Sequence, residues 1–196
     1  MTPPMKSIRL AGALALSFCA LQACEPASST STDITGVMPR LEFSMVRAND
    51  GAPVSAENYR GKTVLLYFGY THCPDECPTT LTDLSDMLRR IGPDAKNARV
   101  LFVTVDPARD TVPVMRAYVH AFGPDIDGLR GDANAIAALA RRYRVLYETT
   151  PASQNRPYAV MHSDSVFVFD GQGRARLVLT STRNAAQLAA MVDALS

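Results

Sequence analysis

The sequence lacks an excess of charge of either sign. It holds 20 Lys and Arg against 19 Asp and Glu, a net charge of +1 over 196 residues. This balance excludes a nucleic-acid-binding protein with a strongly basic surface, and it implies no charged partner. The chain also lacks internal repeats, a glycine-rich phosphate-binding loop and an HExxH motif. The composition is 47% hydrophobic, which is typical of a globular protein with room for one domain.

Cysteine is scarce. Two of the four cysteines, Cys19 and Cys24, lie in an N-terminal apolar segment, and only Cys73 and Cys77 lie in the body of the chain. A small scaffold held together by several disulfides is therefore excluded. The one remaining pair is a candidate for metal binding or for redox chemistry.

The N-terminal apolar segment is too short to cross a membrane. Residues 10–23 follow Lys6 and Arg9 and contain 14 uncharged residues, whereas a transmembrane helix needs about 20. We expect residues 1–23 to be a secretory signal peptide. The segment ends in the letters LQAC, which resemble a bacterial lipobox and predict lipidation of Cys24. The alternative is an ordinary signal peptide followed by an unrelated cysteine.

The residues after Cys24 are rich in Ser and Thr, with five in succession at 28–32. Such a stretch has no hydrophobic periodicity and cannot form a core. The sequence therefore predicts a flexible tether over residues 24–40 and a folded domain over residues 41–196. We expect an extracytoplasmic, periplasmic lipoprotein that is anchored to a membrane through its lipid.

The domain alternates between strand and helix patterns. Buried β-branched and aromatic runs predict strands, and apolar residues at helical spacing predict helices. Asp110 and Asp132 are expected to cap the helices that follow them. The expected strands are 63–69, 99–105, 165–170 and 175–180, and the expected helices are 78–90, 111–122, 132–142 and 184–195.

This order of elements predicts an α/β domain whose central mixed β-sheet is flanked by helices on both faces. The strand at 63–69 should be central, because it is apolar on both of its faces. The last two strands flank Gly171-Gln172-Gly173 and should form an antiparallel hairpin. A thioredoxin-like fold has this order, although order alone leaves other α/β folds open.

The candidate chemistry lies in the sequence THCPDECP, residues 71–78, directly after the central strand. Reactive groups gather at the carboxyl ends of strands in open α/β sheets. Prolines follow both Cys73 and Cys77, which predicts a loop that turns into a helix beginning at Pro78. Thiols beside a helix N-terminus have lowered pKa values, so we expect these cysteines to form thiolates readily.

A thiolate is both a nucleophile and a soft metal ligand, so two functions are open for this pair. The chain has three histidines that could complete a metal site. His120 falls on a predicted helix and is expected to be an ordinary surface residue. His72 is adjacent to Cys73, and neighbouring side chains tend to point apart.

His162 stands just before the predicted strand at 165–170. In thioredoxin-like folds the loop that enters this strand faces the active cysteines and normally carries a cis-proline. Here it reads VMHSD, residues 160–164, without proline. His162 could face the cysteines in its place, but a lone histidine before a strand is also typical of a structural residue, and the residues alone leave both roles open.

Three motifs, which follow one another along the chain, resemble those of a known family. FGYTHCPDECPTTL, TVDPARDT and VMHSDSVFVFD resemble the Sco/SenC family, which comprises extracytoplasmic copper proteins used in assembling cytochrome c oxidase. The resemblance covers most of residues 41–196. It implies a thioredoxin-like fold and one copper ion, Cu(I) or Cu(II), held by Cys73, Cys77 and His162.

The resemblance also implies a function and partners. The expected function is a metallochaperone that delivers copper to the dinuclear copper centre on a cytochrome c oxidase subunit, or helps to assemble it. The alternative is a thiol:disulfide oxidoreductase that reduces the cysteines of that oxidase site, so a thiol reductant is an expected partner. Other copper proteins are possible recipients, the lipid anchor implies a membrane partner, and nucleic acid is not expected.

The spacing of the cysteines and the residue three positions before Cys73 distinguish this chain from two classes of thiol enzyme. Ordinary oxidoreductases have two residues between their cysteines and a cis-proline loop, whereas this chain has three residues and His162. Peroxiredoxins carry Thr or Ser three positions before the reactive cysteine, where this chain has Tyr70, which argues against a thiol peroxidase. The absence of a heptad pattern favours a monomer.

Two parts of the motifs can be explained without a direct role in the site. Glu76 stands where family members commonly carry an apolar residue, and with Asp75 it adds negative charge that disfavours thiolates but favours a bound cation. The two carboxylates are also typical of the start of a helix. The DPARD segment, residues 106–110, is explained as a strand-to-helix turn with a cap.

Overall fold

The computed structural model describes residues 30–154 and 158–195. The predicted signal peptide and Cys24 lie outside the described residues. The strands are β1 (Ser31–Asp33), β2 (Ser44–Arg47), β3 (Pro53–Ser55), β4 (Thr63–Gly69), β5 (Ala98–Thr104), β6 (Ile126–Arg130), β7 (Tyr147–Thr150), β8 (Ala159–His162), β9 (Val166–Phe169) and β10 (Ala175–Leu179). The α-helices are α1 (Glu76–Ile91), α2 (Val112–His120), α3 (Ala133–Arg142) and α4 (Ala185–Asp193), and the short 3₁₀ helices are η1 (Ala56–Tyr59) and η2 (Gly92–Asn97).

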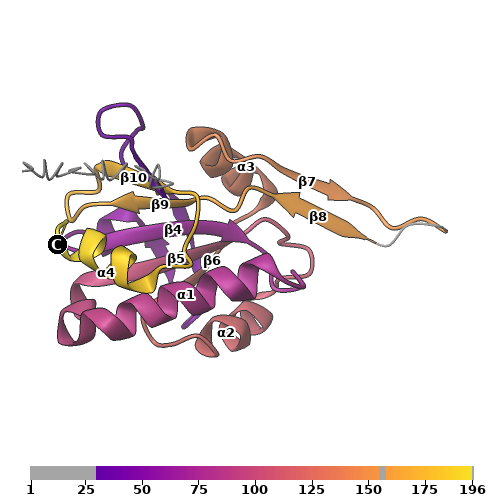
Figure 1. The fold of residues 1–196 in the computed structure, drawn as a ribbon. Coiled ribbons are helices and arrows are strands. Elements are labelled where there is room, and N and C mark those ends of the chain that lie inside the picture. The colour runs from indigo at the N-terminus through magenta and orange to yellow at the C-terminus, as the bar shows by residue number, and fades with distance from the viewer. Residues whose placement is uncertain (1–29, 155–157, 196) are drawn as a thin grey trace, which may run out of the picture.

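An eight-stranded mixed sheet in the order β1-β10-β9-β4-β5-β6-β2-β3 forms the centre of the domain (Figure 1). The strand β4 lies inside the sheet, parallel to β5 and antiparallel to β9. All seven of its residues are buried, as expected for a strand covered on both faces. The predicted central position of 63–69 is therefore confirmed.

Helices cover both faces of this sheet, as predicted. The helices α1 and α4 pack against each other on one face, where α2 also lies (Figure 1). The helix α3 lies on the opposite face, and the ring of Tyr143 at its C-terminal end is 5.6 Å from Phe167 and 5.3 Å from Phe169 of β9. Phe167 is paired with Leu66 of β4 in the sheet. The hydrophobic core on this face therefore extends from α3 to the central strand.

The predicted helices and strands are all present, with ends shifted by a few residues. Asp132 caps α3 by accepting a hydrogen bond from the Ala135 amide at 2.8 Å, and β9 and β10 form the predicted hairpin. The sequence analysis missed six strands, β1, β2, β3, β6, β7 and β8. Each has five residues or fewer. Unlike β9 and β10, which are as short, none has a run of β-branched, aromatic or leucine side chains that would mark it as a strand.

The start of α1 differs from the prediction. The helix begins at Glu76 and not at Pro78, so Cys77 is helical. Pro78 is tolerated as the third helical residue, because the first amides of a helix have no partner within the helix. The sulfur of Cys73 accepts the Cys77 amide at 3.4 Å, and the helix start is therefore built around the two cysteines.

The predicted cap at Asp110 is wrong. Thr111 is the N-cap of α2, and its hydroxyl accepts from the Val114 amide. The Asp110 carboxylate is fully buried and turns toward the cysteine loop, where it accepts the Thr71 amide at 3.0 Å and the Thr71 hydroxyl at 2.6 Å. The hydroxyl of Thr104 also donates to it at 2.6 Å. Three donors held by the fold outweigh the single amide that a cap position offers.

The folded part of the chain begins before residue 41. The strand β1 pairs antiparallel with β10, and Ile34 is buried while its amide donates to the Arg176 carbonyl at 2.9 Å. Residues 31–40, predicted as part of the tether, therefore belong to the domain. Pairing with a sheet edge stabilises a polar segment that could not form a core by itself.

The strands β7 and β8 form a separate two-stranded hairpin that projects from the body of the domain (Figure 1).

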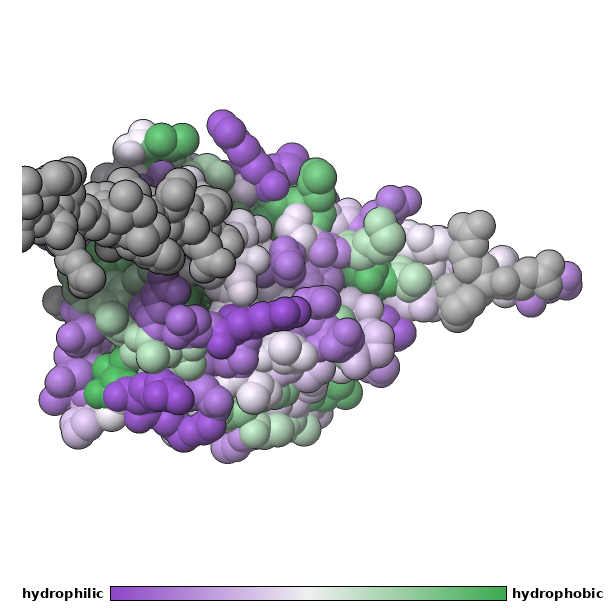
Figure 2. Space-filling model, viewed as in Figure 1, coloured by the Kyte–Doolittle hydropathy of each residue, from purple (hydrophilic) through white to green (hydrophobic). Residues whose placement is uncertain are grey.

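On the face shown in Figure 2, polar residues predominate, and hydrophobic residues visible among the described residues form small separate groups. Within residues 30–154 and 158–195, no helix has the length and apolar character that a membrane span requires.

Replacing Ile34 tests whether the chain before residue 41 is folded. We expect Ile34→Ala to lower the free energy of unfolding by about 2 kcal/mol, because it removes buried methyl groups. Val37→Ala is the matched control, since Val37 is 69% exposed and its replacement should change stability by less than about 0.5 kcal/mol. Chemical denaturation measures both, and equal effects would show that Ile34 does not pack on the domain.

Candidate metal centre

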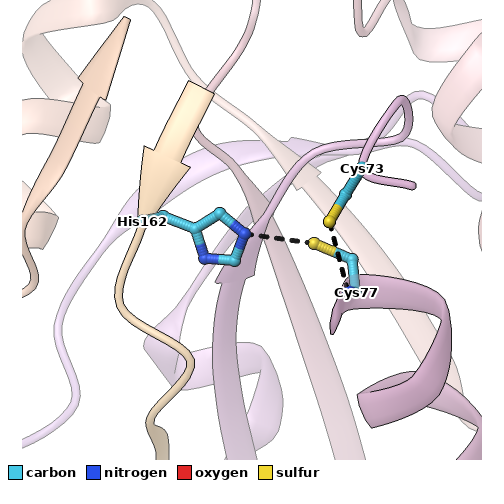
Figure 3. A group of neighbouring side chains, drawn as sticks. All are labelled: Cys73, Cys77 and His162. Carbon is cyan, nitrogen blue, oxygen red and sulfur yellow. Dashed lines mark hydrogen bonds between the residues drawn. The ribbon is translucent and has the colours of Figure 1, made fainter. Parts of the chain in front are cut away.

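Three donor side chains meet at the carboxyl end of β4. Cys73 lies in the loop after β4, Cys77 lies in the first turn of α1, and His162 is the last residue of β8 (Figure 3). One ligand atom from each residue lies within 4.8 Å of the other two. The structure therefore brings together the two cysteines and the histidine that the resemblance implies.

The sheet topology explains why these distant residues meet. Register pairs Tyr67 of β4 with Val166 of β9. The chain enters β9 through His162, and it leaves β4 through Gly69 toward the cysteines. Because β4 and β9 are antiparallel neighbours, the segment before β9 and the segment after β4 lie at the same edge of the sheet.

Cys77 is the most enclosed of the three donors. Its side chain has no exposed surface, and its sulfur lies 3.2 Å from Nε2 of His162. The absence of a side chain at Gly69 makes room for this sulfur. A Cβ atom there would lie 2.8 Å from Cys77 Sγ and 2.6 Å from a ring carbon of Phe102.

His162 is oriented by contacts on the other side of its ring. Its Nδ1 lies 2.9 Å from the Ser163 carbonyl, which can only accept, so Nδ1 carries the proton and donates. This leaves the Nε2 lone pair directed at the sulfurs. Histidines that bind a metal commonly donate a hydrogen bond from the N–H of their other ring nitrogen in this way. The rings of Tyr67 and Tyr70 pack against the imidazole at 6.1 and 5.8 Å between centroids.

The expectation of a lowered thiol pKa is wrong for Cys77. Burial raises the pKa of Cys77 to about 12, and the backbone hydrogen bond from Tyr70 opposes this only in part. Loss of solvent around the sulfur outweighs the favourable field of the helix N-terminus, because no solvent reaches the sulfur to stabilise a negative charge. Without a cation beside it, Cys77 is therefore a thiol at neutral pH.

The other candidates lie away from the three donors. His72 is exposed, and its Nδ1 lies 3.0 Å from the Thr71 hydroxyl. His120 is exposed at the end of α2, which confirms the expected surface position. Asp75 and Glu76 are exposed and border a polar hollow next to the start of α1. None of these four residues belongs to the donor cluster that the described residues form.

Sequence reasoning missed the residues that surround the donors. Tyr67 and Gly69 are two positions apart in β4, so they lie on the same face of the sheet. This is the face that α1 covers. This spacing was available as a signal. The approach of Tyr70 and Ser163 to the imidazole had no signal in the sequence, because it depends on where β8 lies in space.

Comparisons with known proteins identify relatives of this chain. A model of the family described as SCO1/SenC matches residues 38–196. The bovine protein "SCO2 homolog, mitochondrial" is 41% identical over 133 residues, which are 67% of this chain and 50% of that protein. The mouse "SCO2 homolog, mitochondrial" is 36% identical and is covered over 58% of its length. The chain thus spans about half the length of the curated relatives it matches.

Solved structures show the same fold. Copper-bound ScoI of Bradyrhizobium japonicum is 33% identical with a TM-score of 0.73, and the match covers 80% of this chain and 99% of that one. Copper-bound ScoI of Arabidopsis thaliana is 34% identical with a TM-score of 0.71, over 78% and 94% of the two chains. The predicted thioredoxin-like fold is confirmed, and this chain is a member of the SCO1/SenC family.

Proposed function

We propose that this protein is a copper metallochaperone that binds one copper ion through Cys73, Cys77 and His162. The convergence of these three donors within 4.8 Å is the observation that carries the proposal. Two relatives of known structure were solved with copper bound, which supports copper as the metal. The ion would go to the dinuclear copper centre of cytochrome c oxidase, as the family resemblance implies.

The donor set suits copper in both oxidation states. Thiolate sulfur is a soft ligand that favours Cu(I), and imidazole also binds Cu(II). Two thiolates and a neutral imidazole give a net charge of −1 with Cu(I) and zero with Cu(II). Because burial disfavours net charge, the enclosed position of Cys77 stabilises the Cu(II) form relative to Cu(I), and the softness of sulfur opposes this preference.

The surroundings of the site provide access for a partner protein. Cys73 is partly exposed whereas Cys77 is enclosed, so a recipient reaches the metal from the side of Cys73 and His162. Two exposed apolar side chains, Leu146 and Met161, border the same hollow as His162. They offer a hydrophobic contact for the copper-bearing oxidase subunit or another copper protein.

A thiol:disulfide oxidoreductase is the second candidate, and the proximity of the two sulfurs favours it. Oxidation of Cys73 and Cys77 to a disulfide would transfer two electrons and two protons to a disulfide between the cysteines of the oxidase copper site, which becomes a dithiol, and would remove both thiolate ligands from this protein. A thiol reductant must then restore the pair before copper binds. Cys73, the more exposed thiol, would form the mixed disulfide with a substrate, and Cys77 would have to resolve it. The buried, protonated state of Cys77 disfavours that second attack, so the chaperone is the better supported function.

We further propose that the protein is a periplasmic lipoprotein held on a membrane by Cys24, with a tether between Cys24 and β1. The support is the short apolar segment and the LQAC letters. Mass spectrometry of the mature protein should find lipidated Cys24 as the first residue, and Cys24→Ser should release the protein from membranes. An unmodified first residue other than Cys24 would contradict the anchor.

Replacement of each donor tests the metal site. Cys73→Ala and Cys77→Ala should lose tight binding, with a larger drop in affinity than the roughly 10- to 100-fold typical of changes around a metal site. His162→Ala should weaken binding and change the thiolate-to-copper absorption. The measurements are copper stoichiometry and absorption spectra. The controls are His72→Ala and His120→Ala, which should behave as wild type, and unchanged binding in both cysteine variants would contradict the site.

The acidity of Cys77 predicts how copper affinity changes with pH. Because burial raises the pKa of Cys77 to about 12, copper must displace a proton from this sulfur at every pH below that value. The apparent affinity should therefore rise by about tenfold per pH unit from this residue alone. Competition titrations between pH 7 and 9 measure the slope, and an affinity that stays constant over this range would contradict binding through the Cys77 thiolate.

A further inference from the structure

The hairpin that carries His162 lies outside the main sheet, although Val160 of β8 packs into the buried core. In the part of the chain that the structure describes, β7 and β8 pair only with each other, and a lone two-stranded hairpin is at best marginally stable in water. His162 must nevertheless lie 3.2 Å from Cys77. Further contacts between the hairpin and the body of the domain are therefore needed to fix the imidazole.

The loop 106–110 supplies such a contact at the far end of β8. Tyr158 directly precedes this strand, and its hydroxyl donates to Asp106 Oδ1 at 3.0 Å. Arg109 Nε donates to Asp106 Oδ2 at 2.5 Å. The Arg109 guanidinium also lies over the Tyr158 ring, 4.1 Å from its centroid, at a distance suited to a cation–π interaction.

Asp106 is buried although it is charged, with 2% of its surface exposed. A buried carboxylate needs hydrogen-bonding partners, and such charge-assisted bonds are short and directional. Arg109 and Tyr158 bind one carboxylate oxygen each. The loop therefore fixes Tyr158 at two points: the hydroxyl through Asp106 and the ring through Arg109.

The same loop also fixes the cysteine segment. Asp110 accepts both the amide and the hydroxyl of Thr71, at 3.0 and 2.6 Å, two residues before Cys73. The guanidinium of Arg109 lies 5.8 Å from the ring of Tyr70, which packs at 88° to the imidazole of His162. One short loop thus touches both of the segments that carry donors.

We propose that loop 106–110 is a positioning clamp for the metal centre: Asp110 holds the cysteine loop, and Asp106 with Arg109 holds Tyr158 so that His162 faces the sulfurs. These residues do not contact the metal themselves. The proposal rests on the proposed function, in which His162 is a copper ligand. It explains why the DPARD segment carries Asp106, Arg109 and Asp110, side chains that a strand-to-helix turn alone does not need.

Tyr158→Phe tests the clamp, because it removes the hydroxyl and keeps the ring on Arg109. In the metal-free protein, hydrogen exchange of the β8 amides should become faster. Copper affinity should fall by about 10- to 100-fold. The Cu(II) form should lose the electron spin echo modulation from the His162 imidazole while it keeps the thiolate-to-copper absorption. Tyr147→Phe is the matched control on the other strand of the hairpin and should change neither exchange nor affinity.

The outcomes separate the clamp from the proposed function. In the His162→Ala background, Tyr158→Phe should cause no further loss of affinity, because its effect acts through the imidazole. An equal loss in that background, or exchange and copper binding like those of Tyr147→Phe, would overturn the clamp. If wild-type binding does not depend on His162, the copper site is wrong, and the exchange rates of β8 still decide whether loop 106–110 fixes this strand.

Discussion

The contact between Cys77 Sγ and His162 Nε2, at 3.2 Å across 85 positions of sequence, is the interaction on which the rest of the site depends. It exists because β4 and β9 are antiparallel neighbours in the sheet. The cysteine loop leaves one of these strands, and the histidine precedes the other. The donors meet at an edge of a rigid scaffold, and only the hairpin β7–β8 has to be positioned by additional contacts.

Burial of Cys77 determines the chemistry of that contact. Before a metal binds, Cys77 is a neutral thiol, since burial raises its pKa to about 12. No isolated charge then has to be stabilised in the interior. Copper replaces the thiol proton and brings its own positive charge, so metal binding and proton release are coupled. This coupling supports the proposed role as a copper carrier over nucleophilic attack by a free thiolate.

Sequence reasoning predicted the central strand at 63–69 and the cysteine pair because both depend on local patterns. It left His162 open between ligand and structural residue until the family resemblance was considered, because a histidine before a strand carries no sign of what it faces. It assigned Asp110 to a helix cap, since the same residue type caps helices and binds loop amides. The strands β7 and β8 were missed because their pairing and their contacts with loop 106–110 are set by tertiary structure.

The central claim is that one copper ion is bound by two sulfurs and one imidazole. X-ray absorption spectroscopy at the copper edge tests it most directly on the copper-loaded full chain. The account predicts two sulfur neighbours and one imidazole nitrogen, with the imidazole scattering absent from His162→Ala. A first shell without sulfur, or a wild-type spectrum identical to that of His162→Ala, would contradict the account.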